Sequence, residues 1–106
     1  MASPEQTTVV PVQGEVTFSN VAGFGRRLEN ALAAARNVVV DLSEVTFIDS
    51  SGLSALLTAS ATARQRGGAV ALVLGGGEPP SIFRFRGVDH LLALYPDQAT
   101  ALAAMR

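Results

Sequence analysis

Apolar residues follow a β-like pattern in several short stretches of this chain. Residues 8–16 are rich in β-branched side chains, which predicts a strand, and Pro11 within it lacks an N–H group and so favours an edge position or a bulge. Continuous apolar runs at 38–40, closed by Asp41, and at 69–74 predict short strands that are covered on both faces. Such strands are typical of a parallel sheet.

Two stretches between these strands have the three-and-four spacing of an apolar helix face. Residues 20–36 show this spacing, with Asn20 as the expected N-cap. Residues 53–64 show it again, and Gly67 and Gly68 follow them as a pair that permits a left-handed C-cap. Strand and helix patterns therefore alternate along the chain up to residue 74.

The C-terminal part continues this alternation with shorter elements. The proline pair at 79–80 predicts the start of a short helix that ends near Gly87. Residues 91–94 predict a last strand, and Asp97 is the expected N-cap of a helix over 97–105.

This order of elements predicts one α/β domain. At 106 residues, a compact fold would bury about two-thirds of the surface of the unfolded chain, so one core suffices. We expect a mixed, mostly parallel β-sheet of about four to five strands with helices packed around it. Residues 1–7 are expected to be a short flexible tail, and residues 8–106 the domain.

Composition and charge narrow the classes of function. The chain has 48% hydrophobic residues and a formal net charge of -1, so it offers no basic field to nucleic acid phosphates. It has no cysteine, which excludes disulfides and thiolate metal sites. No apolar run approaches the ~20 residues that span a bilayer, and the N-terminus lacks the segments of a signal peptide. We expect a cytoplasmic protein without direct nucleic acid contact or membrane insertion.

One turn holds an acid and two hydroxyls in succession, Asp49, Ser50 and Ser51, followed by Gly52. A single such side chain can cap the following helix, a contribution of about 1 kcal/mol, so the other two exceed what local structure needs. A serine at a helix start also suits a phosphate, because exposed N–H groups and the helix dipole favour a charge of about -1.5 to -2. The turn is therefore a candidate binding and modification site.

The sequence also resembles a known family over nearly its whole length. The segments VVVDLSEVTFIDSSGLSALL (38–57), GGAVALVL (67–74), FRGVDHLLALYPD (85–97) and ATAL (99–102) are similar, in this order, to the bacterial anti-sigma factor antagonists, whose domain is called STAS. The D-[ST]-[ST]-G-L turn is specific when these downstream segments follow it, as they do here.

The resemblance implies a switch protein with no catalysis of its own and no cofactor. In the family, the unphosphorylated antagonist binds an anti-sigma factor with serine kinase activity, which releases the sigma factor. The kinase then phosphorylates the first hydroxyl after the Asp, and a serine phosphatase resets the switch. That hydroxyl is Ser50 here, with Ser51 as the second choice. Asp49, Ser50, Ser51, Gly52 and Thr17 are implied to lie at the partner-binding surface, where Gly52 would let a partner backbone come close.

Three departures from the family pattern bear on this implication. Thr17 stands where the family often has an Asp near the acceptor serine, so the expected pocket has one carboxylate fewer. Asn20 replaces the usual Thr as the cap of the first helix. Only a short segment precedes the strand that leads to Gly14, so the family's first strand is expected to be missing or very short, and pairing through an exposed sheet edge stays open. We expect a monomer or a weak dimer.

Three other motifs could be interpreted as functional sites, but for each of them an ordinary structural role is the better interpretation. Residues 75–80, GGGEPP, lack the Gly-Lys-[Ser/Thr] of a phosphate-binding loop. His90 would complete a triad with Ser50 and Asp49, but the serine lacks the nucleophile elbow. Residues 83–86 mix phenylalanine with arginine, which favours a short helix with its phenylalanines inward over a nucleic-acid platform.

A second class of function stays open beside the switch. The same turn would be plain docking surface in a non-switching STAS interaction subunit, for instance of a lipid-transport ATPase or of a stress-sensing complex. An enzyme is a distant third interpretation.

Overall fold

The computed structural model describes residues 7–76, 81–84 and 91–105 of the chain. The elements are β1 (Thr7–Val16), α1 (Val21–Ala34), β2 (Asn37–Ile48), α2 (Ser50–Gln65), β3 (Ala69–Val73), the 3-10 turn η1 (Ser81–Arg84), β4 (Ala93–Tyr95) and α4 (Gln98–Ala104).

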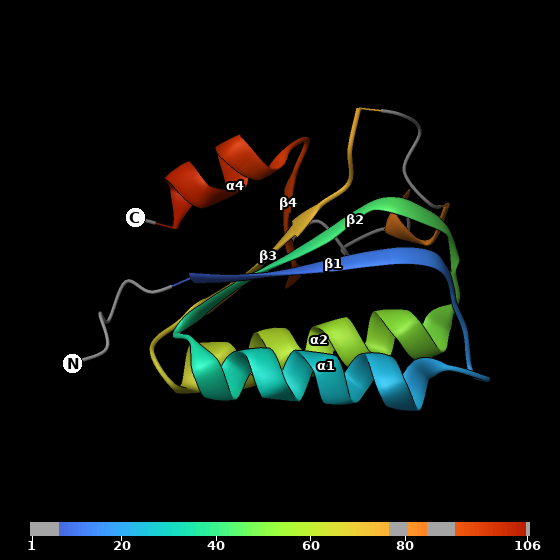
Figure 1. Cartoon of the computed structure of the whole chain (residues 1–106), viewed down its shortest axis with the longest axis horizontal. Coiled ribbons are helices and arrows are strands. Elements are labelled where there is room, and N and C mark those ends of the chain that lie inside the picture. The colour runs from blue at the N-terminus through green and yellow to red at the C-terminus, as the bar shows by residue number, and fades with distance from the viewer. Residues whose placement is uncertain (1–6, 77–80, 85–90, 106) are drawn as a thin grey trace.

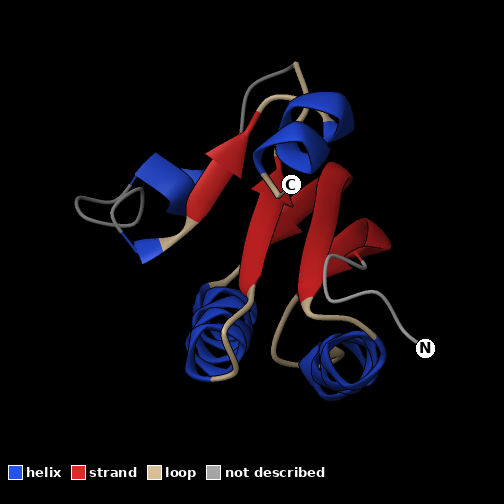
Figure 2. Cartoon of the chain, turned by 90° about the vertical axis from the view of Figure 1, so that its left-hand side faces the viewer, coloured by secondary structure: helices blue, strands red, loops and turns tan. Residues whose placement is uncertain are grey.

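The strands form one sheet in the order β1-β2-β3-β4, with β1 and β4 at its edges. Helices α1 and α2 cover one face of this sheet, and α4 lies on the opposite face (Figures 1 and 2). The predicted α/β fold is therefore confirmed. All three strand pairings among the described residues are parallel, which agrees with the expected mostly parallel sheet, and no antiparallel pair occurs among these residues.

Two apolar layers hold the sheet and its helices together. The larger one lies between the sheet and α1 and α2, and its fully buried side chains include Leu42, Leu56 and Leu72. Full burial of one such leucine contributes about 1.5–3 kcal/mol. The smaller layer joins Val39 of β2 and Ala101 of α4, with Ala71 and Val73 beside them. Because both faces are covered here, the central strands have the continuous apolar sequence from which they were predicted.

Strand β2 is much longer than predicted and does not end at Asp41. It pairs with β3 only as far as Asp41, and from there to Ile48 it pairs with β1 alone. The Asp41 carboxylate stays outside the core and accepts hydrogen bonds from Ser43 N at 2.9 Å, Ser43 Oγ at 2.6 Å and Gln98 Nε2 at 2.5 Å. The apolar run ends where β2 is no longer covered on both of its faces, whereas the strand itself continues to Ile48.

The other predicted elements differ from the structure mainly at their ends. Helix α2 ends in a Schellman motif: Gly67 has a φ of 81°, its N–H donates to Arg64 O at 3.1 Å, and Gly68 N donates to Ala63 O at 2.8 Å. Asp97 caps α4, as predicted, by accepting from Thr100 N at 2.7 Å. The last strand lies at Ala93–Tyr95 rather than at 91–94.

Some predicted features lie outside the described residues or only partly inside them. Residues 81–84 form a 3-10 turn, and the predicted end of that helix near Gly87 lies outside the described part. The same holds for His90, for Phe85 and Arg86, and for the predicted tail apart from Thr7, which is the first residue of β1.

Candidate functional site

The predicted site lies at the corner of the sheet where β1 and β2 end side by side. Val16 and Ile48 are partners in the strand register, and Asp49 N donates to Val16 O at 3.1 Å directly after it. From this point β1 continues into residues 17–20, and β2 continues into the start of α2. We call residues 15–20 and 47–52 the Asp49 corner. The topology thus brings Thr17 and the Asp49–Gly52 turn together, although they are far apart in the sequence.

The Asp49 carboxylate holds this corner together with both of its oxygens. Oδ1 accepts hydrogen bonds from Ser51 N at 2.9 Å and Gly52 N at 3.2 Å, which caps the N-terminus of α2. Oδ2 accepts from Phe18 N at 3.0 Å, in the connection between β1 and α1. Asp49 is therefore the capping residue among the three candidates, and it also fastens a second segment of the chain to the helix.

These hydrogen bonds keep the Asp49 carboxylate ionised. Desolvation alone would raise its pKa, but the N–H groups of Phe18, Gly52 and Ser51 outweigh this effect and hold the pKa below the ordinary value of an aspartate. His90, the third member of the possible triad, lies outside the described residues. The bonds that Asp49 makes within the described part of the chain are those of a helix cap and of a brace to Phe18.

The two serine hydroxyls are left over, as predicted. Ser50 is the first residue of α2 and is exposed, whereas Ser51 is half-buried. Neither hydroxyl makes a hydrogen bond to another residue in the part of the chain that the structure describes. One expectation needs correction: the N–H groups of Ser51 and Gly52 are not exposed for a phosphate, because Asp49 already occupies them. A phosphate on Ser50 would sit beside an ionised carboxylate at a capped helix end.

Gly52 has a structural role within the chain. It is buried, and a Cβ placed on it would lie 2.5 Å from Ile48 Cγ1 and 2.9 Å from Val16 Cγ1. Both distances are shorter than any normal carbon–carbon contact, so only glycine lets α2 start this close to the ends of β1 and β2. The contact of Gly52 with a partner backbone stays a prediction.

The connection that carries Thr17 is held by side chains in an unexpected way. Asn20 stands at the predicted N-cap position of α1, but the expected hydrogen bond from its side chain to the helix is not made. Its Oδ1 instead accepts from Thr17 N at 2.8 Å, and its Nδ2 donates to Glu15 O at 2.8 Å. The Thr17 hydroxyl lies 2.8 Å from Ser19 Oγ. Asn20 therefore braces the turn at the corner rather than the helix.

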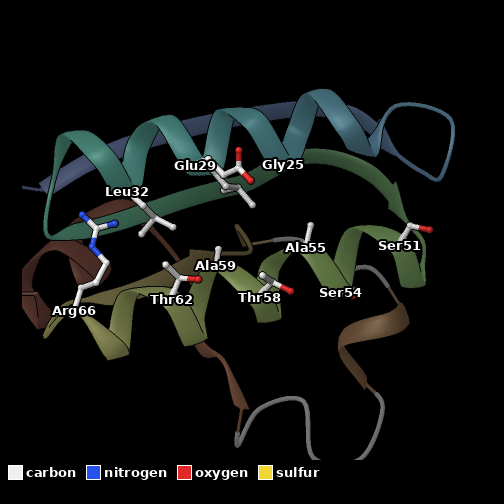
Figure 3. A pocket seen from close by; sticks show the side chains of 11 residues that line it. Gly25, Glu29, Leu32, Ser51, Ser54, Ala55, Thr58, Ala59, Thr62 and Arg66 are labelled. Atoms are coloured by element: carbon white, nitrogen blue, oxygen red, sulfur yellow. The ribbon is translucent and has the colours of Figure 1, made fainter.

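A groove of about 580 Å³ runs from the corner along the space between α1 and α2. Ser51 lies at one end and Arg66 at the other, and small hydroxyl residues of α2, including Ser54, Thr58 and Thr62, line it between them (Figure 3). Its floor is made of side chains of the main core, such as Leu28 and Ala59. Ser51 thus faces this groove, whereas Ser50 is exposed to solvent.

Sequence reasoning missed two residues at the corner. Phe18 is 82% exposed and Phe47 is 49% exposed, although both are large aromatic side chains. The signal was available for Phe47, because it adjoins the buried Ile48 in a strand whose side chains alternate between faces. For Phe18 no sequence pattern distinguished an exposed ring from a buried one.

Two kinds of site are absent from the part of the chain that the structure describes. It contains no group of three or more histidine, aspartate or glutamate residues that could hold a metal ion. No helix within it is long and apolar enough to cross a bilayer.

Comparison with known proteins identifies the family. The sequence pattern of the STAS domain matches residues 1–101 of this chain. The chain belongs to the STAS domain family. No curated protein matches it in sequence.

Solved structures with the same STAS fold come from proteins of more than one kind. An anti-sigma factor antagonist from Mycobacterium paratuberculosis is 24% identical, with 100% of this chain and 99% of that one covered and a TM-score of 0.79. The Bacillus cell fate determinant SpoIIAA, solved in its phosphorylated form, is 21% identical, with 100% and 96% covered and a TM-score of 0.65. A sulfate transporter family protein from Wolinella succinogenes is 19% identical, with 93% and 84% covered and a TM-score of 0.73. At these identities the likeness is one of fold.

Proposed function

We propose that this STAS domain is an anti-sigma factor antagonist that acts in the cytoplasm. It binds an anti-sigma factor with serine kinase activity and thereby releases the sigma factor. Phosphorylation of Ser50 ends this binding, and a serine phosphatase restores it. In this proposal the chain has no catalytic role and needs no cofactor.

The position of Ser50 is the observation that carries the proposal. Its side chain is exposed at the first position of α2, and the helix is already capped by Asp49. The hydroxyl is therefore open to a kinase and not needed for the fold. Ser51, the second choice, is half-buried at the end of the groove and is less open to modification.

The electrostatics of the corner explain how a phosphate would act. A phosphate adds a charge of about -1.5 to -2 beside the ionised Asp49 carboxylate, whose N–H partners are occupied. A partner packed against Ser50 would have to remove water from this charge, and burying an unpaired charge is strongly unfavourable. Binding is therefore lost on the partner side, while the antagonist keeps its fold.

The test is a pull-down from lysate of the organism that encodes the chain, with wild-type, Ser50→Ala and Ser50→Glu baits. Gln65→Glu is the matched control, because it adds the same charge to an exposed position at the opposite end of the same helix. We expect wild type, Ser50→Ala and Gln65→Glu to retain an ATP-binding anti-sigma factor, and Ser50→Glu to retain at most about a tenth as much. Phosphate mapped to Ser50 in the same sample completes the test. Equal retention by Ser50→Glu and wild type would reject the switch.

A second candidate function is a non-switching interaction subunit, for which the fold shared with the Wolinella transporter family protein is the supporting observation. Here the Asp49 corner would be docking surface in a lipid-transport ATPase or a stress-sensing complex. The same experiment separates the two: this candidate predicts that wild-type and Ser50→Glu baits capture the same transporter or assembly component.

A further inference from the structure

Two phenylalanines at the Asp49 corner are exposed, whereas the other phenylalanines whose burial is described are not. Phe18 and Phe47 are 82% and 49% exposed, whereas Phe24 and Phe83 are each 6% exposed and belong to the core. Aromatic side chains bury a large apolar area and dominate the energetics of protein interfaces. Phe18 contributes little such burial to the fold of this chain, and Phe47 contributes only part of what its side chain could.

The backbone holds Phe18 in place even though its ring packs on nothing in the core. Its N–H donates to Asp49 Oδ2 at 3.0 Å, and the neighbouring Thr17 N donates to Asn20 Oδ1 at 2.8 Å. Asn20 Nδ2 also ties the turn to Glu15 O at 2.8 Å. A ring presented on a turn that is already ordered loses little conformational entropy when a partner covers it. Phe18 is therefore well placed to contact a partner protein.

Phe47 lies on the sheet face opposite α1 and α2. Val16 and Ile48 are register partners and are both buried in the main core, so their chain neighbours Glu15 and Phe47, also register partners, point to the other face. On that face α4 packs over Val39, at the other end of β2. The ends of β1 and β2 extend beyond α4 (Figure 1). Glu15 and Phe47 thus lie side by side on a part of the sheet that no helix of the described residues covers.

The two segments that carry the rings hold acidic side chains and no basic ones, although Arg27 of α1 lines a hollow together with Glu15. Residues 12–20 and 43–52 include Glu15, Glu44 and Asp49 but no lysine or arginine. Glu15 and Glu44 are exposed on the strands, whereas Asp49 is occupied by backbone N–H groups. A complementary partner would present basic side chains toward the strands and apolar ones toward the rings.

We propose that Phe18 and Phe47 are the apolar anchors with which the Asp49 corner docks its partner, a protein that presents an apolar pocket bordered by basic side chains. The proposal rests on the proposed function for the role of Ser50, which belongs to the same corner as the anchors. With the rings in the pocket, the surface over Ser50 is closed to water, so a phosphate there must be buried as the rings dock. The basic border faces Glu15 and Glu44 on the strands and does not reach Ser50.

Site-specific photo-crosslinking in the organism's own cells tests where the partner lies. A benzophenone amino acid replaces Phe18, Phe47 or Leu91, one at a time, in the full chain. Leu91 is the control because it is 51% exposed and lies beside Ala69, at the end of the sheet away from Ser50. We expect one protein to cross-link at positions 18 and 47, not at 91, and to disappear when Ser50→Glu is added.

The cross-linked protein is then purified and titrated with the variants Phe18→Ala, Phe47→Ala and Leu91→Ala, each checked for its fold by circular dichroism. We expect at least tenfold weaker binding for each phenylalanine variant and binding within about twofold of wild type for Leu91→Ala. No cross-link at either phenylalanine, or wild-type affinity in both phenylalanine variants, overturns the proposal. A partner that cross-links at 18 and 47, needs the rings, and ignores Ser50→Glu would reject the proposed function while supporting the anchors.

Discussion

The carboxylate of Asp49 lies 3.0 Å from the backbone nitrogen of Phe18, a residue 31 positions earlier in the chain. The same carboxylate caps α2 through its other oxygen. One side chain therefore sets the position of the proposed phosphorylation site and of an exposed aromatic ring. This double role makes Asp49 the residue whose replacement has the widest structural effect at the corner.

We predict that Asp49→Ala destabilises the domain and loosens both segments that the carboxylate joins. Loss of an N-cap lowers the melting temperature of a domain of this size by roughly 5 °C, and loss of the bond to Phe18 adds to it. In hydrogen exchange, the amides of Phe18, Ser51 and Gly52 should exchange faster than in wild type. Ser50→Ala is the control and should melt within about 1 °C of wild type, because its hydroxyl bonds to no other described residue. Unchanged exchange at Phe18 in the Asp49→Ala variant would contradict the bracing role.

The stability of the domain should fall in acid, below about pH 4. Hydrogen bonds from Thr100 lower the pKa of Asp97, and for Asp49 and Asp41 desolvation opposes such bonds but the pKa is still lowered. Since the unfolded chain, with aspartate pKa values of about 3.9, then binds more protons than the folded one, stability rises with pH in this range. It is fully present above about pH 5 and is lost as the pH falls through the lowered values.

Melting temperatures measured between pH 7 and pH 3 test this dependence. We expect little change from pH 7 to pH 5 and a steep decrease below about pH 4. Asp49→Asn should show a lower melting temperature at pH 7 and a shallower decrease in acid, because one of the three aspartates with a lowered pKa is missing. A wild-type protein that is more stable at pH 3 than at pH 6 would refute the assigned direction of these pKa values.

Gly52→Ala should destabilise the domain by about 1–3 kcal/mol, because the new methyl group meets Ile48 and Val16 in a packed core. Gly25→Ala is the matched control: it lies within α1, and a Cβ there meets nothing within 4 Å. Alanine is the better helix former, so this control should raise stability by about 0.5–1 kcal/mol. Urea unfolding of the two variants measures both changes. If Gly52→Ala were as stable as wild type, the close approach of α2 to the strand ends would be disproved.

The outer edge of β1 should resist pairing with a second copy of the chain. Pro11 has no N–H group, and its carbonyl oxygen accepts a hydrogen bond from Arg27 Nη2 of α1. Register shifts follow between Pro11 and Gln13 and again beside Gly14, which interrupts the edge further. Proline, charged side chains and bulges are known means of blocking such edges.

We predict that the double variant with Pro11→Val and Arg27→Ala forms dimers whose population rises with concentration, whereas wild type does so weakly or not at all. Analytical ultracentrifugation at several concentrations measures this difference. Arg26→Ala is the control, because it removes the same charge from the neighbouring, exposed position of α1. A folded double variant with the same association behaviour as wild type would show that Pro11 and Arg27 do not prevent pairing at the outer edge of β1.

Local features of the sequence were sufficient to predict most elements of the fold. The apolar runs at 38–40 and 69–74 are strands because both of their faces are covered, and the Gly67–Gly68 pair ends α2 because glycine at Gly67 adopts the left-handed conformation easily. Asp97 caps α4 through a hydrogen bond to a residue three positions away. Each of these features depends on the residues of one short segment.

Features that depend on contacts between distant segments were decided only by the tertiary structure. The extension of β2 beyond Asp41 follows from its pairing with β1. The polar residues of that segment do not predict a strand there. Asn20 has a side chain suited to a helix cap, but it makes its hydrogen bonds with Thr17 and Glu15 because the turn brings them within reach.

For the candidate site, the sequence by itself indicated Asp49 and Ser50, since three polar residues in succession exceed what one helix cap needs. That Phe18 lies beside them was decided by the fold, because two parallel strands that end side by side bring residues 31 positions apart into hydrogen-bonding distance.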